Sequence, residues 1–146
     1  MGRISASVAL PYPPELVFRV ATRVADLPRW MPEVVSAEML DPVLAVGSRA
    51  RLRLSAAAAG AEIIAAVTQL EPHTRLVMNG SGGPLGVKVA VSLRDAGAGG
   101  TEATVEVELA TPPFLGFVAR EVERKLDAGL PGALERLRAL IEAEPA

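Results

Sequence analysis

The feature that most restricts the fold is a helical unit near the start of the chain that is bounded by prolines. Pro13-Pro14-Glu15-Leu16-Val17-Phe18 opens a helix, because proline fits the first turn and glutamate favours the positive end of the helix dipole. Pro28 moves Leu27 out of the α region, so we expect this helix to end near Ala25 or Asp26. A second short turn can then hold residues 28–31.

Strands are predicted on both sides of this unit, because apolar residues recur there with a period of two. Ile4, Ala6, Val8 and Leu10 alternate with smaller residues before it. After it we predict one strand that begins at Val34 and further strands that span residues 47–57, 62–70, 75–79, 87–94 and 102–109. Gly80-Ser81-Gly82-Gly83-Pro84 is interpreted as a hairpin loop. Consecutive strands with short turns predict an antiparallel meander with one face in solvent.

The last thirty residues predict a long amphipathic helix. Its apolar stripe has spacings of four with one step of three, and consists of Phe114, Val118, Val122, Leu126, Leu130, Leu134, Leu137 and Ile141. Pro131 cannot donate a hydrogen bond to the carbonyl of Asp127, so we expect a kink or a break near it. The sequence contains no repeat or linker, and residues 1–146 are predicted to form a single domain.

Composition restricts the function. Half of the residues are apolar but only five are aromatic, so Val, Leu and Ala must build the core, and small side chains leave room for a cavity. The net charge is −2, and no basic patch indicates a nucleic-acid partner. Cysteine is absent, no signal peptide is evident, and no run approaches the ~20 apolar residues of a membrane span. We expect a soluble cytoplasmic protein without integral membrane association, monomeric or homodimeric.

The order of these elements resembles the polyketide cyclase/START-like superfamily, also called the START/Bet v 1-like or SRPBCC superfamily. The resemblance spans essentially the whole chain and rests on residues 14–18, 29–32, 46–48, 70–72, 99–101 and 134–141. It implies an α+β helix-grip fold. In that fold a curved antiparallel sheet of six or seven strands wraps around a long C-terminal helix, with two short helices after the first strand. A hydrophobic cavity between sheet and helix is implied as well.

Few residues could carry chemistry. His73 is the only histidine, lies in a predicted turn and lacks a nearby partner for acid/base catalysis, so we interpret it as a solvated turn residue. One histidine and no cysteine leave only carboxylates for a metal, and these form no tight cluster. A phosphate-binding loop at residues 80–86 is disfavoured, because Leu85 replaces its third glycine and a strand follows. We expect no catalytic residue, metal or cofactor.

The candidate site is therefore an apolar cavity. The superfamily places an aromatic residue beside the cavity at the position of Trp30, although core packing explains Trp30 and the stripe of the last helix equally well. The predicted lining consists of Phe18, Trp30, Leu52, Leu54, Met78, Val89, Val91, Val105, Val107, Phe114, Phe117, Val118 and Val122.

Three functions remain open at this stage, because the superfamily includes aromatase/cyclases, lipid and hormone carriers and a chaperone co-activator. We prefer the binding of a small hydrophobic ligand, lipid-like or polyaromatic, in the cavity between sheet and C-terminal helix. A polyketide cyclase or aromatase would need polar groups aimed into that cavity. A protein-interaction module would show a filled core and an exposed apolar patch.

Overall fold

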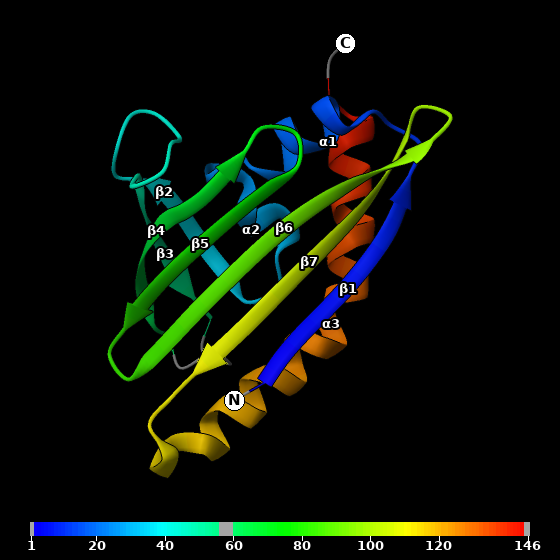
Figure 1. The fold of residues 1–146 in the computed structure, drawn as a ribbon. Coiled ribbons are helices and arrows are strands. Elements are labelled where there is room, and N and C mark those ends of the chain that lie inside the picture. Colours follow the sequence, from blue (N-terminus) through cyan, green and yellow to red (C-terminus); the bar gives the residue numbers. More distant parts are fainter. Residues whose placement is uncertain (1, 56–59, 145–146) are drawn as a thin grey trace.

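The computed structural model describes residues 2–55 and 60–144, and its main feature is one curved sheet (Figure 1). Seven antiparallel strands follow the order β1-β7-β6-β5-β4-β3-β2. Their bounds are β1 Gly2–Leu10, β2 Val34–Met39, β3 Arg49–Leu54, β4 Glu62–Glu71, β5 Arg75–Gly82, β6 Leu85–Gly97 and β7 Gly100–Ala110. Strands β2 to β7 form the predicted meander, and β1 joins it by pairing with β7. The helix-grip prediction is confirmed.

Two short helices follow β1, as predicted, but the first ends early. Helix α1 spans Pro14–Ala21, η1 is a 3-10 turn at Val24–Asp26, and α2 spans Leu27–Trp30. We expected α1 to continue to Ala25 or Asp26. It ends because the backbone of Arg23 is extended. Thr22 caps the helix, and its backbone N–H and its hydroxyl both donate to the carbonyl of Phe18.

The closing helix α3 spans Gly116–Glu142 and lies across the concave face of the sheet (Figure 1). We expected a kink or a break at Pro131, but the helix continues through that residue, and the kink lies at Pro113 instead. Pro131 and Asp127 are both exposed, so the carbonyl of Asp127, which loses its N–H partner, can face water. Figure 1 shows the helix curving along its length, and the chain also bends at Pro113, where the 3-10 turn η3 (Pro113–Leu115) precedes it.

Several strands have other limits than the sequence predicted, and β6 and β7 are both longer than expected. Strand β5 continues to Gly82, so the hairpin turn is shorter than the loop expected at residues 80–84. The glycine at position 80 allows this, because a Cβ there would lie 2.5 Å from the carbonyl oxygen of Ile64 on β4. Strand β3 begins two residues later than predicted and ends at Leu54, whereas Ala57, the expected end, lies outside the described residues.

The outward face of the sheet carries cross-strand ion pairs. The guanidinium of Arg51 lies 2.6 Å from the carboxylate of Glu38 and 3.5 Å from that of Glu62. Glu108 similarly lies between Arg3 and Lys88. Arg49, Arg51 and Arg53 of β3 therefore lie on the solvated face of the sheet, and the inward residues of the same strands form the core with α3.

Candidate ligand-binding site

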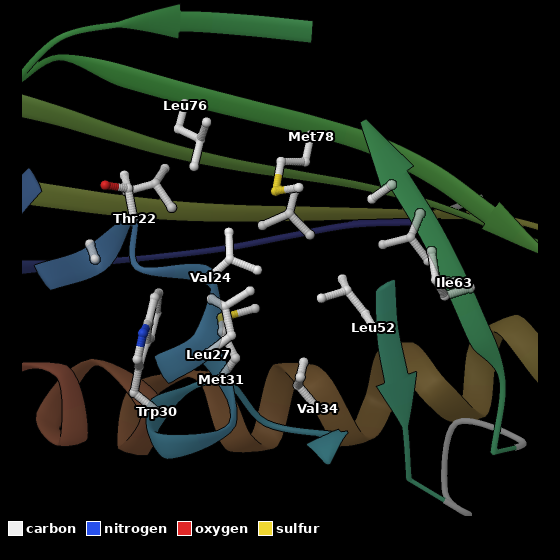
Figure 2. Close-up of a pocket in the computed structure, with 15 residues that line it drawn as sticks. Thr22, Val24, Leu27, Trp30, Met31, Val34, Leu52, Ile63, Leu76 and Met78 are labelled. Carbon is white, nitrogen blue, oxygen red and sulfur yellow. The ribbon is translucent and has the colours of Figure 1, made fainter. Parts of the chain in front are cut away.

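Two small apolar cavities lie between the sheet and the helices. The first has a volume of about 50 Å³ and is enclosed by the segment from α1 to α2 and by strands β2 to β6 (Figure 2). The second has a volume of about 40 Å³ and also reaches β7 and α3. Both are bordered by the same five residues, Met31, Val34, Leu52, Val87 and Val89. These shared side chains separate the two cavities.

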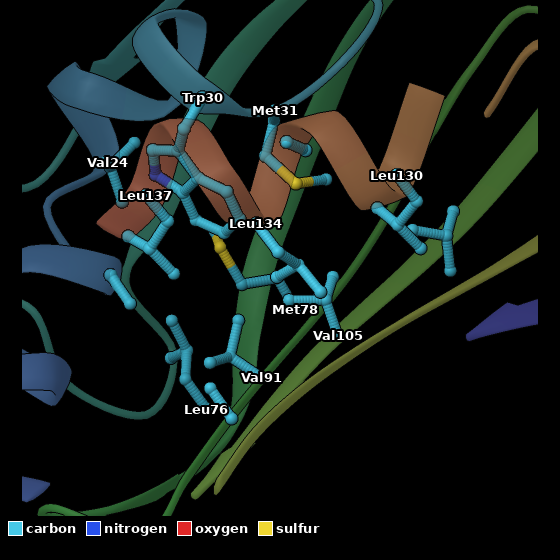
Figure 3. Packing of buried hydrophobic residues seen from close by; sticks show 14 of the residues in the cluster. Val24, Trp30, Met31, Leu76, Met78, Val91, Val105, Leu130, Leu134 and Leu137 are labelled. Carbon is cyan, nitrogen blue, oxygen red and sulfur yellow. The ribbon is translucent and has the colours of Figure 1, made fainter. Parts of the chain in front are cut away.

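The alternation of the strands and the turn at η1 position the lining. On β3 and β4 the inward residues Leu52 and Ile63 are buried, whereas their outward neighbours Arg51 and Ile64 are exposed. Trp30 is completely buried although it ends a four-residue helix. It lies among buried side chains of α3 and the sheet, such as Leu134 and Met78 (Figure 3).

Most of the residues predicted from the sequence border one of the cavities. Trp30, Leu52, Met78, Val89 and Val91 line the first. Leu52, Leu54, Val89, Val107 and Val122 line the second. Their role in binding a ligand remains a prediction.

Five predicted residues lie elsewhere. Phe18 and Val105 are buried in the core, and Phe18 meets the ring of His73 edge-on, with 6.0 Å between the ring centres. Val118 packs against the core but borders neither cavity. Phe114 and Phe117 are 76% and 63% exposed, so their placement in the cavity was wrong. The reason is that η3 and the first turn of α3 extend past the sheet (Figure 1), where the helical stripe has nothing to cover it.

Sequence reasoning missed lining residues of the first cavity in the α1–α2 segment and in strands β2, β4, β5 and β6. They are Ala21, Thr22, Val24, Leu27, Met31, Val34, Ile63, Ala65, Leu76 and Val87. The alternation of β5 contained a signal for Leu76, which shares a face with Met78, whereas the paired Ile63-Ile64 of β4 left its inward face unresolved. No periodicity marks η1, because a three-residue turn is too short to show one.

Very few polar groups border the first cavity. Among its described lining residues only Thr22 and Trp30 carry a side-chain N–H or O–H, and none carries a charge. Glu33 is the one charged residue among the described lining of the second cavity, and its carboxylate accepts a hydrogen bond from the Ser55 hydroxyl at 3.2 Å. His73 lies in an exposed turn with a φ of 63°. Within residues 2–55 and 60–144 no cluster of three or more potential metal ligands occurs.

An ion pair connects the α1–α2 segment to the end of α3. The guanidinium of Arg23, next to the cavity residues Thr22 and Val24, donates two hydrogen bonds to the carboxylate of Glu144. These bonds hold the pKa of Glu144 below its usual value, and Arg19 adds to the effect at 3.5 Å. They also raise the pKa of Arg23. The pair fixes one wall of the first cavity to the closing helix.

The comparisons with known proteins agree with this geometry. Residues 1–142 match the model of a family described as "Polyketide cyclase / dehydrase and lipid transport". The chain belongs to this family. A search among curated proteins finds no significant match.

Solved structures of similar shape include three with sequence identities from 13% to 23%. The Zhui aromatase/cyclase from Streptomyces sp. R1128 has a TM-score of 0.78 and 13% identity, over 97% of this chain and 93% of that one. A Deinococcus radiodurans protein has a TM-score of 0.73 and 23% identity, over 97% of this chain and 98% of that one. Ara h 8.0201 has a TM-score of 0.66 and 19% identity, over 98% of this chain and 99% of that one. At these identities the likeness establishes the fold alone.

No helix in the described part of this family member is long and apolar enough to cross a membrane.

Proposed function

We propose that this protein binds a small apolar molecule in the space between the sheet and α3. The observation that carries the proposal is the pair of adjoining apolar cavities. The second reaches α3, where the resemblance predicted a cavity, and the first lies between the sheet and the α1–α2 segment. Ligand sites are typically concave, mainly apolar and supplied with a few polar groups, and the first cavity has this character. The lipid-transport part of the family description supports the same function.

The two cavities are small. Their volumes of about 50 and 40 Å³ are well below the roughly 300–1,000 Å³ of sites for drug-sized ligands. Inward side chains from β3 to β6 and from the α2 region fill most of the space. A ligand must therefore displace side chains on binding, and Met31, Met78 and Leu52 are the suitable ones. Methionine is unbranched and repacks easily, and Leu52 separates the two cavities.

A cyclase or dehydrase reaction fits the site less well. The Zhui protein is named as an aromatase/cyclase, but it shares only 13% identity with this chain. General acid/base catalysis needs a titratable group within hydrogen-bond reach of the reacting atom. The first cavity has no such group among its described lining residues, and the second has Glu33 alone. Binding without chemistry is the function that this lining supports best.

A cavity-filling substitution tests the proposal. In Ala65→Leu the added carbons enter the first cavity, because Ala65 is buried there on β4. Its neighbour Ala66 faces the other side of the strand, so Ala66→Leu is the matched control. Butylbenzene is the probe, and its affinity is measured by titration calorimetry and by the melting temperature. If Ala65→Leu is overpacked and does not fold, Ala65→Val replaces it.

At a probe concentration about a hundredfold above Kd, binding should stabilise the protein by about 2.7 kcal/mol and raise its melting temperature by roughly 5–10 °C. We expect Ala65→Leu to weaken binding at least tenfold and Ala66→Leu to leave it unchanged. Equal affinity in the two variants, or no response of the wild type to the probe, would refute the proposal.

A further inference from the structure

We propose that the ligand is a neutral hydrophobe with one oxygen-bearing group, a hydroxyl or a carbonyl, which lies against Trp30 and Thr22 at the α1 end of the first cavity. This inference rests on the proposed function and specifies the ligand class. It excludes fatty acids and other carboxylates as the preferred ligands.

The indole N–H of Trp30 is a buried donor that lacks an acceptor. Among the described residues, only Trp30 Nε1 and Arg138 Nε are buried side-chain polar atoms without a hydrogen bond. Arg138 Nε still lies 3.7 Å from the Glu135 carboxylate, so it has an ionic partner. An indole nitrogen can only donate, and buried donors are nearly always paired. A ligand oxygen is the kind of partner that Trp30 lacks.

Thr22 supplies the complementary group at the same end of the cavity. Its hydroxyl donates to the Phe18 carbonyl at 2.7 Å, so its oxygen lone pairs are left to accept a hydrogen bond. Figure 2 shows Thr22 and Trp30 toward the α1 side of the pocket, with Leu52 and Ile63 toward the other. A ligand hydroxyl or carbonyl oxygen can accept from Trp30, and only a hydroxyl can also donate to a threonine oxygen. The rest of the ligand meets only apolar side chains.

Charge decides between an alcohol and an acid. No described residue that lines the first cavity is charged, so a bound carboxylate would be desolvated without a cation. The nearest charged lining residue, Glu33 of the adjoining cavity, is itself anionic and offers no cation. A protonated amine would find only Glu33, which is already hydrogen-bonded to Ser55. A neutral polar group is therefore the one that this site stabilises.

Three matched probes test the inference, namely butylbenzene, 4-butylphenol and 4-butylbenzoate at pH 8. The chain contains one tryptophan, so its indole N–H gives a single, assigned resonance in a nitrogen-edited proton spectrum. We expect 4-butylphenol to bind roughly threefold to tenfold more tightly than butylbenzene, which corresponds to one net hydrogen bond. It should also move the indole resonance downfield, butylbenzene should not, and the benzoate should bind at least tenfold more weakly than the phenol.

Two variants separate hydrogen bonding from packing. Trp30→Phe removes the N–H but keeps an aromatic ring, and Thr22→Val removes the hydroxyl with nearly the same shape. Each should reduce the preference for the phenol, measured as the ratio of the phenol affinity to the butylbenzene affinity within one variant. A merely structural role of these residues would change both affinities alike. Denaturation checks that Trp30→Phe folds. If Trp30→Phe does not fold, Thr22→Val serves alone.

The outcomes distinguish the two proposals. An unmoved indole resonance with bound phenol, an unchanged phenol preference in both variants, or a benzoate that binds as tightly as the phenol would overturn this inference while ligand binding stands. If none of the three probes binds, the proposed function fails, and this inference fails with it.

Discussion

Replacement of Leu52 by alanine should destabilise the empty protein and at the same time improve its binding of small apolar molecules. Leu52 is buried on β3 and borders both cavities, so its side chain is the partition between volumes of about 50 and 40 Å³. Truncation to alanine would join them into one space. An apolar cavity of about 150 Å³ is known to stay dry and to bind benzene, and the joined space would approach that size.

The magnitude follows from the removed atoms and the space that they leave. Three carbon groups at about 0.8 kcal/mol each give a transfer cost of about 2.4 kcal/mol. Buried Leu→Ala changes cost about 2.7–5.0 kcal/mol, and the cost grows with the residual cavity. Since the new space joins two existing ones and cannot collapse fully, we expect a decrease of about 3–4 kcal/mol in the free energy of unfolding. Urea denaturation measures it.

The same variant should gain affinity for the probe. Because wild-type Leu52 must move when butylbenzene binds and the alanine side chain need not, we expect the affinity to rise at least tenfold. Titration calorimetry gives this value, and Ile64→Ala on the exposed face of β4 is the control. A loss of less than 1 kcal/mol without a gain in affinity would mean that Leu52 does not separate the cavities, and the reasoning would be refuted.

Three further predictions concern other parts of the molecule. The pKa of Glu144 lies below its usual value because of Arg23. Their ion pair therefore stabilises the fold at pH values above the usual glutamate pKa of about 4.3. This stabilisation disappears as the pH falls through the lower pKa of the folded state. The melting temperature of Glu144→Gln should therefore lie below that of the wild type at pH 7 and converge with it at low pH; a constant difference would contradict the linkage. The double substitution Phe114→Ser and Phe117→Ser should change the unfolding free energy by less than about 0.5 kcal/mol, because both rings are exposed. It should also leave the affinity for butylbenzene unaltered. A tenfold loss of affinity would mean that these rings reach the ligand. Val107→Arg should unfold the protein, because Val107 is buried on β7. Arg51→Glu should leave the circular dichroism spectrum nearly unchanged, because Arg51 is solvated on β3. Equal effects of the two substitutions would mean that the sheet faces are reversed.

The sequence predicted the elements better than their ends. Strict alternation identified the inward residues of β3 and β7, because a period of two leaves only one way to bury Leu52 or Val107. The paired Ile63-Ile64 of β4 could not be resolved by periodicity alone. Its orientation follows from antiparallel pairing with β3, where Ile63 lies opposite Leu52. The end of α1 depends on the hydrogen bonds of Thr22 to Phe18, which no propensity reports.

The candidate site was predicted in location but not in size. Patterns of apolar residues indicate which side chains face inward, and they contain no information on how far the sheet and α3 approach each other. The exposed Phe114 illustrates the limit, because its helical stripe continues beyond the last strand that could cover it. The unpaired N–H of Trp30 is likewise a property of three-dimensional packing, and no sequence signal marks it.

The most direct test of the central claim is to locate a bound probe with methionine methyl resonances. Of the four methionines, Met31 and Met78 line the first cavity, whereas Met39 lies on β2 and borders neither cavity. With methyl-labelled methionine and bound butylbenzene, we expect nuclear Overhauser contacts from the ligand to Met31 and Met78 and none to Met39. Contacts to Met39 alone, or none to Met31 and Met78 while the probe is bound, would contradict a ligand site between the sheet and α3.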